Sequence, residues 1–157
     1  MRPPGVAMEN RSLEPDICVH NYYRALHNAP PLTVNPQLSQ MATNWAHYLL
    51  ANNFQKPIHS HNGFGENIYY GYLSNSGGAD AVRAWYNEIS LYNWNYPSYS
   101  EQTGHFTQLV WKSSTELGIG VARRGDIIYV VCNYNPSGNY ENQFRTNVAY
   151  PNYVYRN

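Results

Sequence analysis

The chain has 157 residues, and its ten basic and ten acidic side chains cancel at neutral pH. This length suits one domain, and the scattered, balanced charge excludes the basic surface by which nucleic-acid-binding proteins are recognised. We therefore expect no nucleic-acid partner. Sixteen tyrosines carry much of the apolar content, and only 13% of the residues are charged. Such a composition suits clefts for apolar or amphipathic ligands, or loops covered by rings.

The first fourteen residues combine proline, glycine and charge without hydrophobic periodicity. They predict a flexible N-terminal tail, 1–14, before a single domain over 15–157. The tail has no apolar core of the kind that a secretory signal needs. Cys18 and Cys132 are the only cysteines. One disulfide is possible, but we favour two buried thiols acting as small apolar groups.

Two helices are expected in the first third of the chain. The first should begin near Pro15 and end before the prolines at 30–31, which cannot continue a helix. Its expected face consists of Cys18, Tyr22, Ala25 and Leu26. The second should run from Pro36, capped by Asn35, to the asparagines at 52–53. Its apolar stripe is the clearest periodic signal in the chain and comprises Leu38, Met41, Ala42, Trp45 and Leu49.

A third helix and a short fourth helix enclose an aromatic loop. Residues 79–92 predict a helix with Val82, Trp85 and Ile89 on one side, and residues 93–102 predict the loop. Residues 103–111 predict a short helix capped by Thr103, because their apolar residues follow helical spacing. These are Phe106, Leu109 and Val110. A histidine, His105, stands on the turn that enters this apolar helix.

The last third of the chain predicts a β-hairpin. Leu117, Ile119 and Val121 alternate with other residues, as in a half-buried strand. The sequence RRGD at 123–126 makes the turn, and the apolar run 127–132 suits a central strand covered on both faces. Residues 57–78 mix short extended pieces with glycine turns. Together these elements predict an α+β fold, a three-layer α-β-α sandwich with a small antiparallel sheet.

Four polar residues could form a functional site. Two imidazoles and two carboxylates can bind a divalent metal or act as an acid/base set. The spacing does not choose between these roles and structural ones, such as capping by Glu66 or a solvated helix position for Glu88. The four residues are His59, Glu66, Glu88 and His105.

Five segments resemble, in the same order, motifs of the CAP superfamily of cysteine-rich secretory, antigen-five and pathogenesis-related proteins. They are the residues at 20–32, 59–67, 84–94, 104–111 and 129–140. The resemblance implies an α-β-α sandwich in which His59, Glu66, Glu88 and His105 line a central cleft. In several members the two histidines hold zinc or another divalent ion, so we expect His59 and His105 to be metal ligands.

Members of this family are also implicated in binding sterols and fatty acids. In the yeast exporters of the group, the aromatic loop before the short helix is the implied sterol site. Sterol, fatty acid or phospholipid is therefore the expected ligand of this loop, although the rings could instead simply pack it. The rings are Tyr92, Trp94, Tyr96 and Tyr99.

The segment 117–122 lacks a cysteine that secreted members often carry. In this respect the chain resembles the disulfide-poor, Golgi-associated branch, which associates peripherally with membranes and can dimerise. We therefore expect an intracellular protein of the cytosol or Golgi membrane, or a secreted one if a signal peptide has been removed.

The expected function is that of a non-enzymatic protein that binds a divalent metal and either binds sterol or another lipid at membranes or engages protein partners. A metal- or Glu/His-dependent hydrolase is the alternative, and a dimerising interaction module is a third. A serine nucleophile has been proposed for the Golgi-associated branch, but Tyr72 occupies the implied position here. Ser60 and Ser74 lie nearby and would need a base. His61 could join a metal, but we favour a place at the mouth of the cleft.

Overall fold

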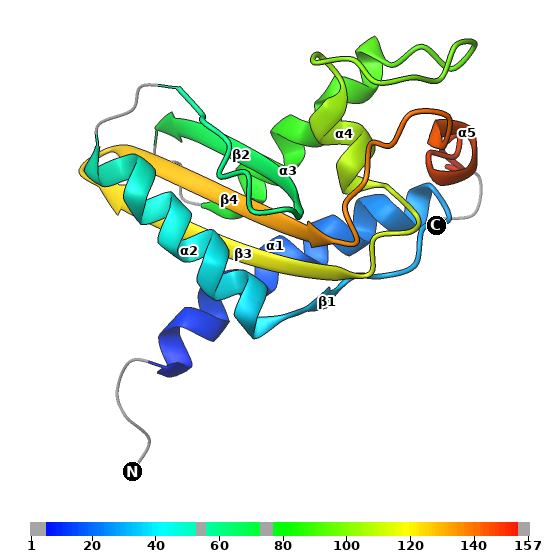
Figure 1. Ribbon diagram of the computed structural model, residues 1–157. Coiled ribbons are helices and arrows are strands. Elements are labelled where there is room, and N and C mark those ends of the chain that lie inside the picture. The colour runs from blue at the N-terminus through cyan, green and yellow to red at the C-terminus, as the bar shows by residue number, and fades with distance from the viewer. Residues whose placement is uncertain (1–5, 53–55, 73–76, 154–157) are drawn as a thin grey trace.

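The computed structural model describes residues 6–52, 56–72 and 77–153, with side chains from residue 15 onward (Figure 1). Helices and strands are interspersed along the chain. The elements, in chain order, are α1 Val6–Leu26, β1 Thr33–Val34, α2 Pro36–Ala51, β2 Gly65–Tyr72, α3 Gly78–Tyr86, the 3-10 helix η1 Asn87–Leu91, α4 Gly104–Leu109, β3 Glu116–Arg124, β4 Ile127–Asn135 and α5 Phe144–Asn147.

The strands form one sheet in the order β1-β3-β4-β2. β1 runs parallel to β3, and the other neighbours are antiparallel. Helix α2 covers one face, while α1, α3 and α4 lie on the other (Figure 1). The predicted three-layer α-β-α sandwich is therefore confirmed, and so is the hairpin, whose strands β3 and β4 lie in the middle of the sheet.

Helix α2 forms as the sequence predicts. Asn35 lies just before it, and its side-chain oxygen accepts hydrogen bonds from the backbone N–H groups of Gln37 and Leu38 at 2.9 and 3.1 Å. The helix lies directly on β3, since a Cβ added to Gly120 would come within 2.2 Å of the Thr43 nitrogen. Only glycine allows this approach without movement of the helix.

Helix α1 differs from the prediction at its start. It begins at Val6 rather than near Pro15, so residues 6–14 are helical, and residues 1–5 lie outside the described residues. The flexibility of the tail remains a prediction. The predicted face of the helix is wrong in part, because Cys18 is exposed and Tyr22 is 56% exposed. Of the two cysteines, both free thiols, only Cys132 is buried.

The buried face of α1 is mainly polar. Asp16, His20, Arg24 and His27 are each at most 1% exposed and follow the spacing of one helical face. Hydrophobic periodicity cannot detect such a face, because it searches for apolar residues. Polar groups can occupy these positions only because most of them find hydrogen-bond partners inside the protein.

The third predicted helix is divided into two segments. The α-helix ends at Tyr86, and the 3-10 helix η1 continues to Leu91. Val82 and Trp85 are buried as predicted. The short helix α4 is present with its apolar stripe fully buried, but Thr103 makes no capping hydrogen bond through its side chain.

Candidate functional site

The first His/Glu pair joins η1 to α4. His105 and Glu88 form a hydrogen bond of 2.9 Å between Nδ1 and Oε2. The other carboxylate oxygen accepts the backbone N–H of Phe106 at 3.0 Å. Glu88 therefore caps the start of α4 in place of Thr103 and orients the imidazole with the same carboxylate. The ring of Trp85 stacks on that of His105, with centroids 6.1 Å apart.

The second pair links the segment before β2 to its first residues. His59 Nδ1 and Glu66 Oε1 lie 2.9 Å apart. The same carboxylate accepts hydrogen bonds from the Ser60 backbone N–H at 2.9 Å, the Ser60 hydroxyl at 2.5 Å and Asn133 Nδ2 at 3.1 Å. Glu66 is thus held by four donors.

These contacts set the charge of the second pair. Burial raises the pKa of Glu66. The hydrogen bonds from His59, Ser60 and Asn133 lower it by more, so the net pKa lies below the ordinary 4.5. The hydrogen bond to Glu66 raises the pKa of His59 against the opposing effect of burial. The pair therefore favours a carboxylate beside an imidazole that protonates more readily than usual.

A hollow of about 280 Å³ lies at the second pair. His59, His61 and Glu66 line it, together with Tyr99 and residues that include Gln108 and Asn139. Glu88 and His105 are not among its described lining residues. His61 also lines this hollow, and its place at the mouth of a common cleft remains a prediction. The prediction that all four site residues line one cleft remains a prediction.

The two pairs are nevertheless neighbours. Asn67 follows Glu66 in β2, and its Nδ2 donates to the backbone carbonyl of His105 at 3.0 Å. Asn139 lines the hollow and donates to the carbonyl of Gly104 at 2.9 Å. The start of α4, which carries His105, is therefore tied to the hollow from two sides.

The donor chemistry fits a divalent cation held by few protein ligands. Both histidines direct Nδ1 to a carboxylate, the usual outer partner of a metal-binding imidazole, and such a bond leaves Nε2 as the ligand atom. Among the described residues, however, no three His, Cys, Asp or Glu side chains are grouped closely enough to hold a metal. Zinc sites usually have three or four protein ligands, so water would have to complete this one.

A buried polar chain lies behind the site. His20 Nδ1–H donates to the Asp16 carbonyl at 2.9 Å, so Nε2 accepts from the Tyr134 hydroxyl at 2.7 Å. Asn67 donates to that hydroxyl at 3.3 Å. Burial lowers the pKa of His20 to about 4, which keeps its ring neutral. The chain links α1 to the residue that holds the backbone of His105.

Arg24 fixes the other end of α4. Its Nη1 donates to the carbonyls of Leu109 and Trp111 at 3.0 and 2.8 Å, and its Nη2 donates to that of Ser114 at 2.9 Å. Burial lowers the pKa of Arg24 to about 10, so it stays charged at neutral pH. Sequence reasoning missed both Arg24 and His20. The available signal was their helical spacing with Asp16 and His27. This spacing indicates a buried face only if polar residues are allowed to be buried.

The aromatic loop has two anchored and two exposed rings. Tyr92 is 7% exposed, and Trp94 packs against Phe106 and Tyr150 at centroid distances of 6.3 and 5.0 Å. Tyr96 and Tyr99 are 75% and 48% exposed. Tyr92 is buried and Trp94 is half-buried, whereas Tyr96 and Tyr99 are exposed. The role of the four rings in lipid binding remains a prediction.

A serine hydrolase arrangement is missing from the described part of the site. The Ser60 hydroxyl donates to Glu66, and no serine there shares a hydrogen bond with a histidine. Tyr72 is 72% exposed at the end of β2, and Ser74 lies outside the described residues.

The fold and this site define a CAP-type domain. BmVAL-1 superposes with a TM-score of 0.69 at 22% identity, over 90% of this chain and 84% of that one. NaASP2, solved with Zn²⁺, gives a TM-score of 0.67 at 24% identity, over 88% and 86%. At these identities the likeness shows the fold alone. The model of the family CAP, the cysteine-rich secretory protein family, matches residues 18–134, and the chain belongs to this family.

The relatives include fungal, human and plant proteins. Protein PRY2 of Saccharomyces cerevisiae is 40% identical over 135 residues, which cover 82% of this chain and 38% of that protein. Repressed by EFG1 protein 1 of Candida albicans is 39% identical over 122 residues, 76% and 44% of the two chains. The chain therefore spans less than half of these two fungal relatives. The Golgi-associated plant pathogenesis-related protein 1 of Homo sapiens is 36% identical over 137 residues, 84% and 88%.

The compartment is not fixed by these findings. One relative is named as Golgi-associated, and a Candida albicans relative is named as a secreted protein. Within the described ranges, no helix combines the length and the hydropathy required to cross a membrane. The intracellular location remains a prediction.

Proposed function

We propose that this chain is a non-enzymatic CAP domain that binds a divalent cation through His59 and His105. The observation that carries the proposal is the matched pairing of the two imidazoles, each with Nδ1 at 2.9 Å from a glutamate oxygen. A carboxylate acceptor keeps the proton on Nδ1 and leaves the Nε2 lone pair for a cation. The family resemblance assigns the same two residues this role.

Each pair supplies orientation as well as a donor atom. Glu88 is anchored by the Phe106 N–H, and Glu66 by Ser60 and Asn133. Neither imidazole can therefore rotate without breaking a bond to a fixed carboxylate. A cation bound there could in turn coordinate an anionic or carbonyl oxygen of a ligand.

Calorimetric zinc titration tests this function. Wild type should bind one ion per chain, and the double variant His59→Ala/His105→Ala should bind at least tenfold more weakly, because both protein ligands are gone. His47→Ala is the matched control, since His47 is an exposed histidine on α2. Equal heats for wild type and the double variant would refute the proposal.

A second function, lipid binding at the aromatic loop, is favoured by the exposure of two rings. Tyr96 and Tyr99 are exposed to solvent, while Tyr92 and Trp94 pack against the core. Exposed rings on an anchored segment can cover an apolar ligand and offer it hydroxyl groups. The ligand classes are those implied by the family resemblance: sterol, fatty acid or phospholipid.

Fluorescent sterol and fatty-acid binding tests this second function. Tyr96→Ala/Tyr99→Ala should lose binding while keeping the unfolding temperature of wild type, because neither ring lies in the core. Tyr72→Ala removes another exposed tyrosine, from the end of β2, and should leave binding unchanged. Unaltered binding by the double variant would exclude the loop as the lipid site.

A further inference from the structure

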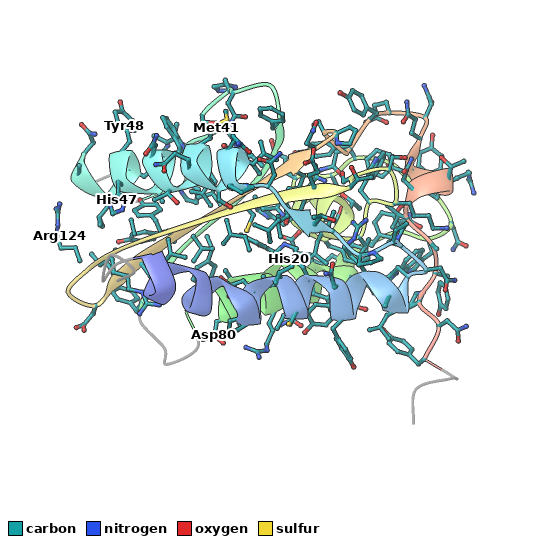
Figure 2. All side chains as sticks on the ribbon, turned by 90° about the horizontal axis from the view of Figure 1, so that it is seen from below. His20, Met41, His47, Tyr48, Asp80 and Arg124 are labelled. Carbon is teal, nitrogen blue, oxygen red and sulfur yellow. The ribbon has the colours of Figure 1, made fainter. Side chains whose placement is uncertain are left out.

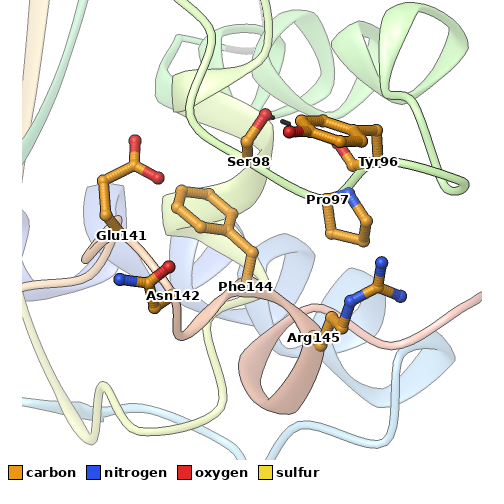
Figure 3. A pocket seen from close by; sticks show the side chains of 7 residues that line it. All are labelled: Tyr96, Pro97, Ser98, Glu141, Asn142, Phe144 and Arg145. Carbon is orange, nitrogen blue, oxygen red and sulfur yellow. Dashed lines mark hydrogen bonds between the residues drawn. The ribbon is translucent and has the colours of Figure 1, made fainter.

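A second hollow lies between the aromatic loop and α5 (Figure 3). Its volume is about 300 Å³. It shares no described lining residue with the hollow at His59. The loop contributes Tyr96, Pro97 and Ser98. The segment before α5 contributes Glu141 and Asn142, and α5 itself contributes Phe144 and Arg145.

Two opposite charges line this hollow. In Figure 3 the Glu141 carboxylate lies on one side of the Phe144 ring and the Arg145 guanidinium on the other. Both residues are exposed. Among the described side chains neither one forms an ion pair. The two charges are therefore available to a ligand.

The floor and the rim of the hollow are aromatic. Phe144 is 1% exposed and packs edge-on against Trp111, with centroids 5.0 Å apart, so its ring is fixed. Tyr96 is 75% exposed and stands at the rim. The accessible ring of Tyr96 suits a small cationic group, because a cation is attracted to the negative face of an aromatic ring.

A buried hydroxyl of the aromatic loop has no partner. The Tyr92 oxygen makes no hydrogen bond within the described chain. Burial raises the pKa of Tyr92, and the charge of Arg145 partly offsets this effect.

The two charges disfavour several ligand classes in this hollow. The body of a sterol would remove water from two charges without offering either a partner, which is unfavourable. A simple anion would meet the repulsion of Glu141, and a simple cation that of Arg145. A ligand that carries both charges, a short distance apart, satisfies both residues.

We propose that this hollow binds a zwitterionic headgroup of the phosphocholine type. The phosphate accepts hydrogen bonds from the Arg145 guanidinium. The quaternary ammonium lies near Glu141 and against the ring of Tyr96. The inference rests on the proposed lipid binding by the aromatic loop, and it names the headgroup. Free phosphocholine and a phosphatidylcholine bilayer present the same chemistry.

The test uses titration of the full chain with soluble phosphocholine, followed by chemical shifts. Wild type should show saturable shifts at residues around the hollow. Arg145→Gln should weaken binding about tenfold, as expected for loss of a charged hydrogen-bond donor. Tyr96→Leu should weaken it about threefold through loss of the cation–π contact. Glu141→Gln should weaken phosphocholine binding while strengthening that of inorganic phosphate.

Charge-matched controls separate the site from general electrostatics. Lys56→Gln and Asp126→Asn remove exposed charges from residues that do not line the hollow and should bind like wild type. Absence of saturable shifts in wild type, or equal affinity of Arg145→Gln and Lys56→Gln, would overturn the inference.

Sedimentation with phosphatidylcholine vesicles identifies the source of the headgroup. Binding to both soluble and bilayer forms supports the site and the proposed lipid function together. Binding to the soluble form alone supports the site and refutes bilayer phosphatidylcholine as its source. A third outcome is that Tyr96→Ala/Tyr99→Ala loses sterol binding while wild type does not bind phosphocholine. This result would support the lipid function and overturn the proposal that the hollow binds a phosphocholine headgroup.

Discussion

Asp16 is the residue whose burial is hardest to reconcile with its charge. Its side chain is 1% exposed, and neither carboxylate oxygen has a hydrogen-bond partner in the described chain. The carboxylate lies against the start of α3, where a Cβ on Gly78 would come within 2.2 Å of Oδ2. Burial raises the pKa of Asp16 from the ordinary 3.8 to about 7, although Arg123 lowers it in part.

The sign of the pH effect follows from that shift. The folded state binds the Asp16 proton more tightly than the unfolded state does. At pH values where the unfolded carboxyl is ionised, Asp16 therefore favours unfolding. Stability should therefore fall as pH rises from about 4 to about 7 and stay low above that range. Asp16→Asn removes the ionisation and should raise the free energy of unfolding at pH 8 by roughly 2–4 kcal/mol.

Urea unfolding at pH 4 and pH 8 measures this effect. The gain from Asp16→Asn should become small at pH 4, where the folded-state carboxyl is protonated and the pH lies close to the ordinary pKa of 3.8. Asp126→Asn, in the exposed hairpin turn, is the control and should show no such pH dependence. A gain of equal size at both pH values would show that ionisation of Asp16 is not its cause.

A second pH effect belongs to His59. Its pKa is raised mainly by the hydrogen bond to Glu66, and a protonated imidazole cannot bind a metal. Zinc affinity should therefore drop about tenfold for each pH unit below the folded pKa of His59. Zinc titrations at pH 5.5 and 7.5 check this, and pH-independent affinity would contradict a role for His59 as ligand.

Helix α4 is the element on which the site depends most. It has only six residues, Gly104–Leu109, too few for an isolated helix to be stable in water. Tertiary contacts at both ends must hold it, through the Glu88 carboxylate at its start and Arg24 at its end. The orientation of His105 is therefore set by residues on other elements.

Arg24→Leu should destabilise the protein by roughly 3–5 kcal/mol, because it leaves several buried carbonyls without a donor. Arg24→Lys should recover part of this loss, since an ammonium can reach only some of the same acceptors. Hydrogen exchange should show the earliest loss of protection at the amides of α4. If the α4 amides of Arg24→Leu were as protected as those of wild type, the proposed role of Arg24 in holding α4 would be contradicted.

The elements also show what sequence alone can predict. Helix α2 was predictable, because its asparagine cap and apolar stripe are both local signals. The hairpin of β3 and β4 was predictable for the same reason. The buried face of α1 was not, because His20 and Arg24 are buried by partners that lie 114 and 85 to 90 residues away in the chain. Such contacts leave no local pattern.

At the scale of the whole molecule, the layers bring distant polar residues together. Figure 2 shows His20 on α1, on the side of the sheet opposite α2, among the side chains between α1 and the sheet. From there, Tyr134 in β4 and Asn67 in β2 extend hydrogen bonds to the backbone of His105. The pairing of Glu88 with His105 joins residues 17 apart, and no spacing rule predicts it. The family resemblance named these residues, and the fold supplies the contacts.

The central claim is that His59 and His105 bind the same cation through their Nε2 atoms. Nitrogen chemical shifts of the six histidine rings, recorded while one equivalent of zinc is added, test it most directly. We predict that the Nε2 signals of His59 and His105 shift together and saturate at one ion per chain, while those of His20, His27 and His47 stay in place. A shift of His59 with His61 but without His105, or no shift in either proposed ligand, would contradict the claim.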